Sequence, residues 1–193
     1  MIQKEIGSVI KLLPKSAAAG LTPIKISNTK IIELEKFTLT SISAYKGESK
    51  NLSEQLKKSH GLALPHYGRA TGREGSRALW FGRQTLLVGP KCDEKLTKFA
   101  MLTDQSDAWV VLRMSGDLME AVLMRLSPVD VRLKTFKTGS VVRTSLIHVN
   151  VTMHRIGANT IDVYGFRSMA KTLCHELTQA LSAAAARDEE ILS

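Results

Sequence analysis

The last third of the chain constrains the fold most strongly, because three β-rich stretches precede one long amphipathic helix. Val141 to Val149, Val151 to Ile156 and Thr160 to Tyr164 are rich in β-branched and apolar residues, and a turn at Gly157-Ala-Asn159 separates the last two. Strands joined by such short turns pair antiparallel. We expect a helix that is capped by Ser168 and covers this sheet.

That final helix carries one apolar stripe, which recurs every four residues: Met169, Leu173, Leu177 and Leu181. The earlier part of the chain alternates between strands and helices in the same way. The sequence predicts strands over Phe37 to Tyr45, Ala78 to Val88 and Ala108 to Met114, and helices over residues 51–59, Cys92 to Ala100 and from Asp117, where Asp117 and Glu120 form a capping box. The order indicates an α+β fold with mixed or antiparallel sheets and helices.

A length of 193 residues favours one domain. Residues 1–36 carry few deep apolar positions, although short β-like pieces fall at Pro23 to Ile26 and Lys30 to Leu34. We therefore expect an N-terminal arm or extension over 1–36 and a single α+β domain over 37–193. No stretch approaches the roughly 20 apolar residues of a membrane span, and the N-terminus shows no secretory signal, so we expect a cytoplasmic protein.

The net charge of +9 and a pI near 9.7 suggest an acidic partner. Aromatic residues make up only 5% of the chain, which weakens the case for single-stranded nucleic acid stacking on this protein. The sequence also lacks helix-turn-helix, RNP-type and zinc-finger spacings. We therefore expect neither a nucleic acid nor a membrane as the partner.

No catalytic, cofactor-binding or metal-binding constellation is recognisable. The five histidines are scattered, Cys92 and Cys174 lie in no metal-ligand spacing, and a histidine such as His154 in a predicted strand is by default a core or strand-face residue. The glycines of residues 62–77 have the wrong offsets for a nucleotide loop.

The stretch from Leu62 to Arg77 is the most unusual. Its glycines predict an extended glycine-rich loop, and it carries Arg69, Arg73 and Arg77 at four-residue intervals. Such arginines hold carboxylates or phosphates well. If the protein stands alone, a solvated loop is an equally good interpretation. In an assembly, a subunit interface is the better interpretation, because arginine is enriched at interfaces.

From about Leu62 to Leu181 the sequence resembles the gamma subunit of bacterial heterotetrameric sarcosine oxidase. The resemblance rests on the order and spacing of short motifs: Leu62-Ala-Leu-Pro65, Leu87-Val-Gly89-Pro90, the run from Leu102 to Gly116, Arg125-Leu-Ser-Pro-Val-Asp130, Phe136, Gly139, Arg143-Thr144, Leu146-Ile-His148 and Arg167-Ser168-Met-Ala. Lys91-Cys92 departs from the acidic or aromatic continuation expected there.

The resemblance implies an α+β fold similar to the folate-binding domain of the glycine-cleavage aminomethyltransferase. It implies alpha, beta and delta subunits as partners, and a complex that demethylates sarcosine oxidatively with FAD, FMN and NAD and passes the one-carbon unit to tetrahydrofolate. In this family the gamma subunit is mainly structural, so no catalytic residue and no cofactor site is transferred to this chain.

Three alternatives remain open at this point. In the first, the chain is an equivalent subunit of a related N-methyl amino acid oxidase or dehydrogenase, for example one that acts on N-methylglutamate. In the second it is a standalone folate-binding module, and in the third a basic nucleic-acid-binding protein.

Overall fold

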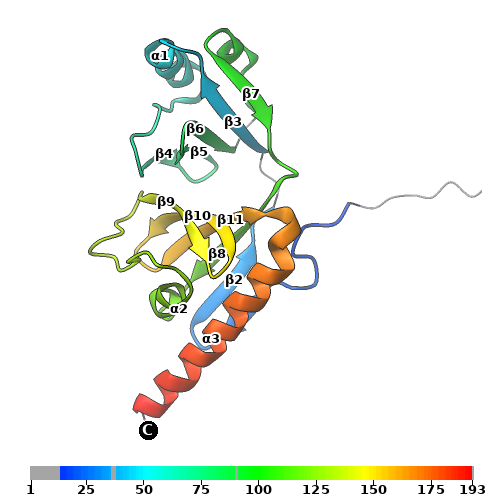
Figure 1. Ribbon diagram of the computed structural model, residues 1–193, viewed down its shortest axis with the longest axis vertical. Coiled ribbons are helices and arrows are strands. Elements are labelled where there is room, and N and C mark those ends of the chain that lie inside the picture. The colour runs from blue at the N-terminus through cyan, green and yellow to red at the C-terminus, as the bar shows by residue number, and fades with distance from the viewer. Residues whose placement is uncertain (1–13, 36–37, 90, 193) are drawn as a thin grey trace, which may run out of the picture.

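The structure is a computed structural model, and it describes residues 14–35, 38–89 and 91–192. Within these residues the chain forms two antiparallel sheets with helices on their outer faces, which confirms the predicted α+β class. Figure 1 shows the layers in order: α1, the five-stranded sheet, the six-stranded sheet, and then α2 and α3. We call the six-stranded sheet sheet A and the five-stranded sheet sheet B.

Sheet A has the strand order β1-β2-β8-β11-β10-β9, and every neighbouring pair is antiparallel. Its strands are β1 (Ile24–Ile26), β2 (Thr29–Glu33), β8 (Trp109–Ser115), β9 (Val141–Leu146), β10 (Val149–Gly157) and β11 (Thr160–Phe166). The three β-rich stretches of the last third are thus consecutive strands of one sheet, as predicted, but the turn between the first two lies at residues 147–148, so Val149 belongs to β10 and not to the first strand.

Helices α2 (Met119–Leu126) and α3 (Ala170–Leu192) cover the outer face of sheet A. The leucines of the stripe are buried as expected, since Leu173, Leu177 and Leu181 are at most 1% exposed, whereas Met169 precedes α3 and is only partly buried. Burial of leucine side chains of this kind contributes about 1.5–3 kcal/mol each.

The helix starts differ from the predicted caps. Ser168 lies inside a 3-10 turn (Arg167–Met169) that precedes α3 and has no capping hydrogen bond. The capping box predicted at Asp117 is also wrong, because the hydroxyl of Thr29 accepts the Leu118 N–H at 3.0 Å instead. A distant strand, which no local pattern reveals, satisfies this helix terminus.

Sheet B has the order β4-β5-β6-β3-β7, again antiparallel throughout. Its strands are β3 (Thr38–Ala44), β4 (Ala70–Arg73), β5 (Ser76–Phe81), β6 (Gln84–Gly89) and β7 (Ala100–Asp104). Helix α1 (Ser49–His60) and a 3-10 helix (Glu94–Lys98) pack on its outer face through Leu52, Leu56 and Leu96.

Two expectations for this sheet are corrected. The segment expected to be one loop up to Arg77 contains the β4–β5 hairpin, with Gly75 at a φ of +83° in its two-residue turn. The stretch expected to be one strand over Ala78 to Val88 is two strands, because Gly82 adopts a φ of +75° and permits a tight turn. Strand β7 was not predicted.

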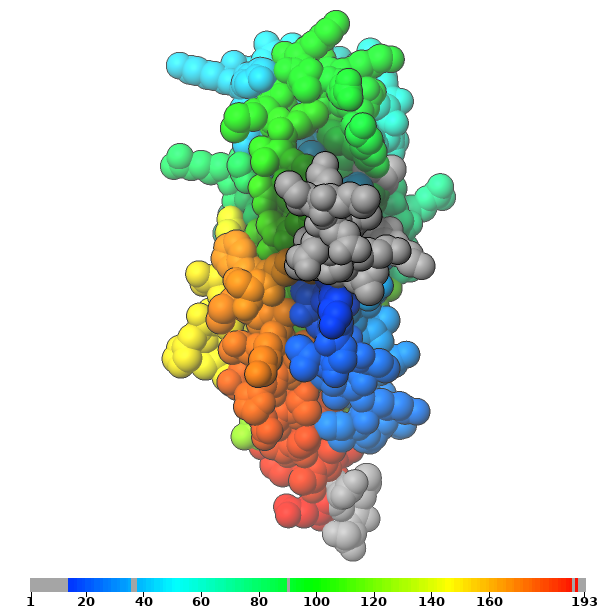
Figure 2. All heavy atoms as spheres, turned by 90° about the vertical axis from the view of Figure 1, so that its right-hand side faces the viewer, coloured from blue at the N-terminus to red at the C-terminus, as the bar shows by residue number. Residues whose placement is uncertain are grey.

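The expected boundary at residue 36, between an N-terminal arm and the α+β domain, is wrong for the described residues. Strand β2 pairs with β8, and Ile31 on it is fully buried, so residues 24–33 are an integral part of sheet A. Ala18 is also buried against the core of this sheet, and Figure 2 shows the N-terminal described segment lying beside α3. Residues 1–13 of the predicted arm lie outside the described residues.

Among the described helices, none has both the length and the apolar character needed to cross a membrane.

Candidate functional site

Along its strands, the inner face of sheet A changes from aromatic to apolar to charged side chains. Trp109, Val111 and Arg113 alternate along β8 and so point to the same face, toward sheet B. Their partners on β11 are Phe166, Tyr164 and Asp162, in that order. The seam between the two sheets therefore has an aromatic end, an apolar middle and a charged end.

The apolar middle joins the sheets into one packed unit. It is a cluster of buried residues from both sheets: Leu39, Leu79, Phe81 and Leu86 from sheet B, and Val111, Val141 and Tyr164 from sheet A. Tyr164 is 1% exposed, and burial raises the pKa of its hydroxyl. A cavity opens on either side of this cluster.

At the charged end, Arg113 connects the two sheets. Its Nε and Nη2 atoms donate to the two carboxylate oxygens of Asp162 at 2.7 and 3.0 Å, and its Nη1 atom donates to Glu74 in the β4–β5 turn. Burial raises the pKa of Asp162 and outweighs the opposing hydrogen bonds from Arg113, whereas those bonds lower the pKa of the exposed Glu74. These groups line a cavity of about 490 Å³.

His154 lies next to this cluster on β10 and is only 1% exposed, as expected of a strand-face histidine. Its ring nitrogens lie 3.3 and 3.5 Å from Nη1 of Arg77 on sheet B. Burial lowers the pKa of His154 to about 3, and the charges of Arg77, Arg113 and Arg69 add to the effect. The imidazole is therefore neutral near pH 7, far from the pKa that suits a general acid or base there.

The structure separates the three arginines that the sequence grouped together. Arg69 donates to Ser140 Oγ at 2.9 Å and to the Thr138 carbonyl at 3.2 Å, so it ties sheet B to the start of β9. Arg77 faces His154. The side chain of Arg73 is exposed and makes no hydrogen bond or ion pair with the described residues.

Arg73 and Arg77 line one small cavity of about 270 Å³, together with Glu74, His154 and Gly139. The sequence interpretation missed Arg113 and Asp162, which complete the neighbouring charged cluster. A charged residue inside each apolar strand was the only available signal. Across residues 14–35, 38–89 and 91–192, no three His, Cys, Asp or Glu side chains are grouped so that they could hold a metal ion.

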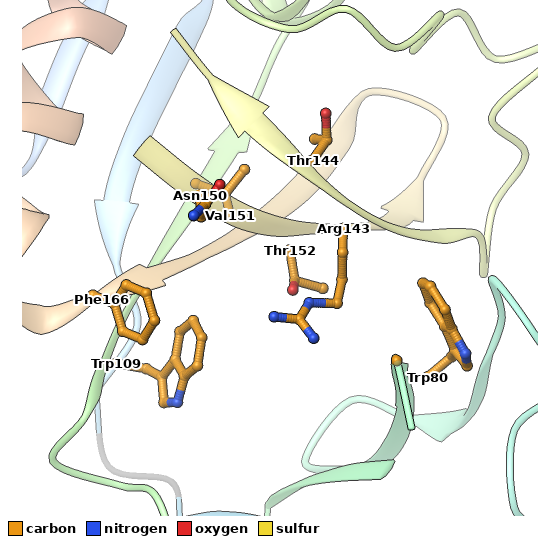
Figure 3. Close-up of a pocket in the computed structure, with 9 residues that line it drawn as sticks. Trp80, Trp109, Arg143, Thr144, Asn150, Val151, Thr152 and Phe166 are labelled. Atoms are coloured by element: carbon orange, nitrogen blue, oxygen red, sulfur yellow. The ribbon is translucent and has the colours of Figure 1, made fainter. Parts of the chain in front are cut away.

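The aromatic end encloses a second large cavity, of about 500 Å³ (Figure 3). We call it the aromatic cleft, and its lining residues are Trp80, Gly82, Trp109, Arg143, Thr144, Asn150, Val151, Thr152 and Phe166. The ring of Trp109 stacks on Phe166 with centroids 4.7 Å apart and meets Phe81 edge-on at 5.2 Å. In the view of Figure 3, the guanidinium of Arg143 lies between Trp80 and Trp109.

No protein-family model matches the chain, and no curated protein matches its sequence. Solved structures do match its fold. A chain of the heterotetrameric sarcosine oxidase from Corynebacterium sp. U-96, in complex with pyrrole 2-carboxylate, aligns with a TM-score of 0.77 and 22% identity over 90% of this chain and 97% of that chain.

The glycine cleavage system aminomethyltransferase T from Bartonella henselae aligns with a TM-score of 0.55 and 14% identity. The match covers 78% of this chain but only 45% of that one. At these identities the comparisons establish a shared fold, and they agree with the fold that the sequence resemblance implied.

Proposed function

We propose that this chain is the gamma subunit of a heterotetrameric sarcosine oxidase and that its role is structural. The observation that carries the proposal is the extent of the fold match, which spans nearly all of both chains. The two chains are thus of similar size, and the likeness concerns a whole subunit. The order of the sequence motifs supports the assignment to gamma.

In this proposal the complete enzyme contains alpha, beta and delta subunits and works in the cytoplasm. It demethylates sarcosine to glycine with FAD, FMN and NAD, and it transfers the one-carbon unit to tetrahydrofolate. The geometry of the seam supports a structural role for this chain. Arg113 pairs with Asp162 on its own sheet and with Glu74 on sheet B, and His154 is held neutral, so these groups are better suited to holding the sheets together than to catalysis.

The proposal is tested by tagging the chain in its native cell and purifying it under mild conditions. We expect three other chains to elute with it, together with flavin absorbance and sarcosine-dependent oxygen consumption. N-methylglutamate serves as the competing substrate, since preference for it would assign the complex to the related oxidases. Elution of the tagged chain alone would contradict the proposal.

The cofactors belong to the other subunits in this proposal. The chain purified by itself should therefore show no flavin absorbance in the visible spectrum. A stoichiometric flavin band would mean that this chain holds a cofactor of its own.

We further propose that the face of Arg69, Arg73 and Arg77 serves assembly. Arg73 is the cleanest probe, because Arg69 and Arg77 also hold the two sheets together. Arg73→Glu should lower the yield of the complex, since like charges at an interface cost several kcal/mol, while each intact complex keeps its activity. Lys57→Glu, on the exposed side of α1, is the matched control. Normal yield with slow turnover would instead assign Arg73 to substrate binding.

A further inference from the structure

The aromatic cleft and its surroundings expose several aromatic side chains. Phe166 at its rim is 45% exposed. Tyr67, whose ring lies 4.5 Å from that of Trp80, is 83% exposed. The chain has only two tryptophans, and both line this cavity. Tryptophan, tyrosine and arginine are the residues most enriched at the energetic centres of protein interfaces.

Arg143 gives the cleft a positive charge. The Arg143 side chain is exposed, and among the described residues no carboxylate forms an ion pair with it. Its guanidinium carbon lies 4.4 Å from the centroid of the Phe81 ring, a cation–π contact that positions the group. An arginine held in this way can receive a carboxylate in a bidentate pair.

The wall of the cleft also contains a buried donor without an acceptor. The indole N–H of Trp109 is buried and has no hydrogen-bond partner in the part of the chain that the structure describes. A buried donor without a partner costs about 1–3 kcal/mol. Because this N–H is not accessible, Trp109 offers its ring, and not a hydrogen bond, to an occupant of the cleft (Figure 3).

The backbone beside the cleft has an open strand edge. Strand β9 is at the edge of sheet A. Its start is covered, since the Val141 N–H donates to the Gly68 carbonyl at 2.8 Å. From Val142 to Leu146, no described residue pairs with the outer edge of the strand. Open strand edges recruit extended segments, with main-chain bonds for affinity and side-chain pockets for specificity.

We propose that the aromatic cleft and the adjoining edge of β9 bind an extended segment of another subunit, in which an acidic side chain lies among apolar ones. The acidic group pairs with Arg143, and the apolar side chains pack on Trp80, Trp109 and Phe166. A second copy of this chain is the poorer occupant, because the chain carries a net charge of +9 and would repel itself. The inference rests on the proposed function, since it requires a partner subunit.

The test compares tagged wild type, Arg143→Glu and Arg83→Glu in the native cell. Arg83 is the matched control, because it is an exposed arginine in the β5–β6 turn that does not line the cleft. We expect Arg143→Glu to reduce recovery of the complex at least tenfold and Arg83→Glu to change it less than twofold. Equal thermal unfolding of the two purified variants excludes a folding defect as the cause.

A photo-crosslinking residue at Tyr67 identifies the occupant directly. In the assembled complex we expect a cross-link to a peptide of another subunit that contains Asp or Glu beside apolar residues. That synthetic peptide should then change the tryptophan fluorescence of the wild-type chain and not that of Arg143→Glu.

The outcomes separate the two proposals. If wild type recovers no other subunit, the proposed function and this inference both fail. If wild type and Arg143→Glu recover the complex equally well, only this inference fails, and a cleft filled by a small molecule would give that result. A cross-link to a second copy of this chain, or to a peptide without an acidic residue, also overturns it.

Discussion

His154 links the ionisation of a single residue to the stability of the protein. Burial and the nearby arginines hold its pKa at about 3, below the ordinary value of 6.5. Between these values the unfolded chain binds the proton and the folded chain does not, so stability is lost as the pH falls from about 6.5 toward 3. We expect His154 to account for about 2–3 kcal/mol of the loss between pH 6.5 and 4.5.

The measurement is urea unfolding at several pH values. His154→Gln removes the titrating group, so the pH profile of this variant should be flatter than that of wild type by the stated amount. His66→Gln, at an exposed position, is the matched control. Identical profiles for wild type and His154→Gln would show that the histidine ionises freely in the folded protein.

Two carboxylates that share Arg113 should differ sharply in their contribution to stability. The Asp162 side chain is 5% exposed, whereas that of Glu74 is 72% exposed. Asp162→Asn leaves a largely buried arginine without its main counter-charge, and breaking such a pair costs about 3–5 kcal/mol. Glu74→Gln removes a solvent-screened pair and should cost less than about 1 kcal/mol. Denaturant midpoints measure both, and equal losses would contradict the assignment of Arg113 to the buried pair.

At the scale of an element, α3 is the helix on which the core of sheet A depends. Leu177 is fully buried, while Gln179 is exposed on the opposite face. Leu177→Ala should destabilise the protein by about 2–5 kcal/mol, through lost transfer energy and the cavity that remains. Gln179→Ala should stay within about 0.5 kcal/mol of wild type. Equal denaturant midpoints for the two variants would mean that the leucine stripe is not buried within this chain.

At the scale of the whole molecule, the apolar middle of the seam predicts that the two sheets unfold together. Leu86 of sheet B is fully buried in the same cluster as Val111 and Tyr164 of sheet A. Leu86→Ala should therefore accelerate hydrogen exchange in the amides of β8 and β11 as well as in those of β3 and β6. Faster exchange confined to residues 38–104 would show two independent domains, contrary to the single domain that we propose.

The sequence alone determined the elements whose signal is local. The β-branched and apolar residues of β10 and β11 and the four-residue stripe of α3 are local signals of strand and helix geometry. The α+β class follows from their order, and the motif order pointed to the correct fold. The hairpins within residues 62–88 were not predicted, because a few glycines with positive φ decide whether such a stretch is a loop, one strand or two.

Tertiary structure decided everything that depends on residues distant in the chain. Thr29 caps α2 only because β2 pairs with β8. Arg113 and Asp162, and likewise Trp109 and Phe166, become neighbours through one register of β8 with β11. The two ends of the seam, one charged and one aromatic, exist only once sheet B packs on that face. Sequence spacing carries no information about such contacts, because pairing across sheets is set by the packing of the whole chain.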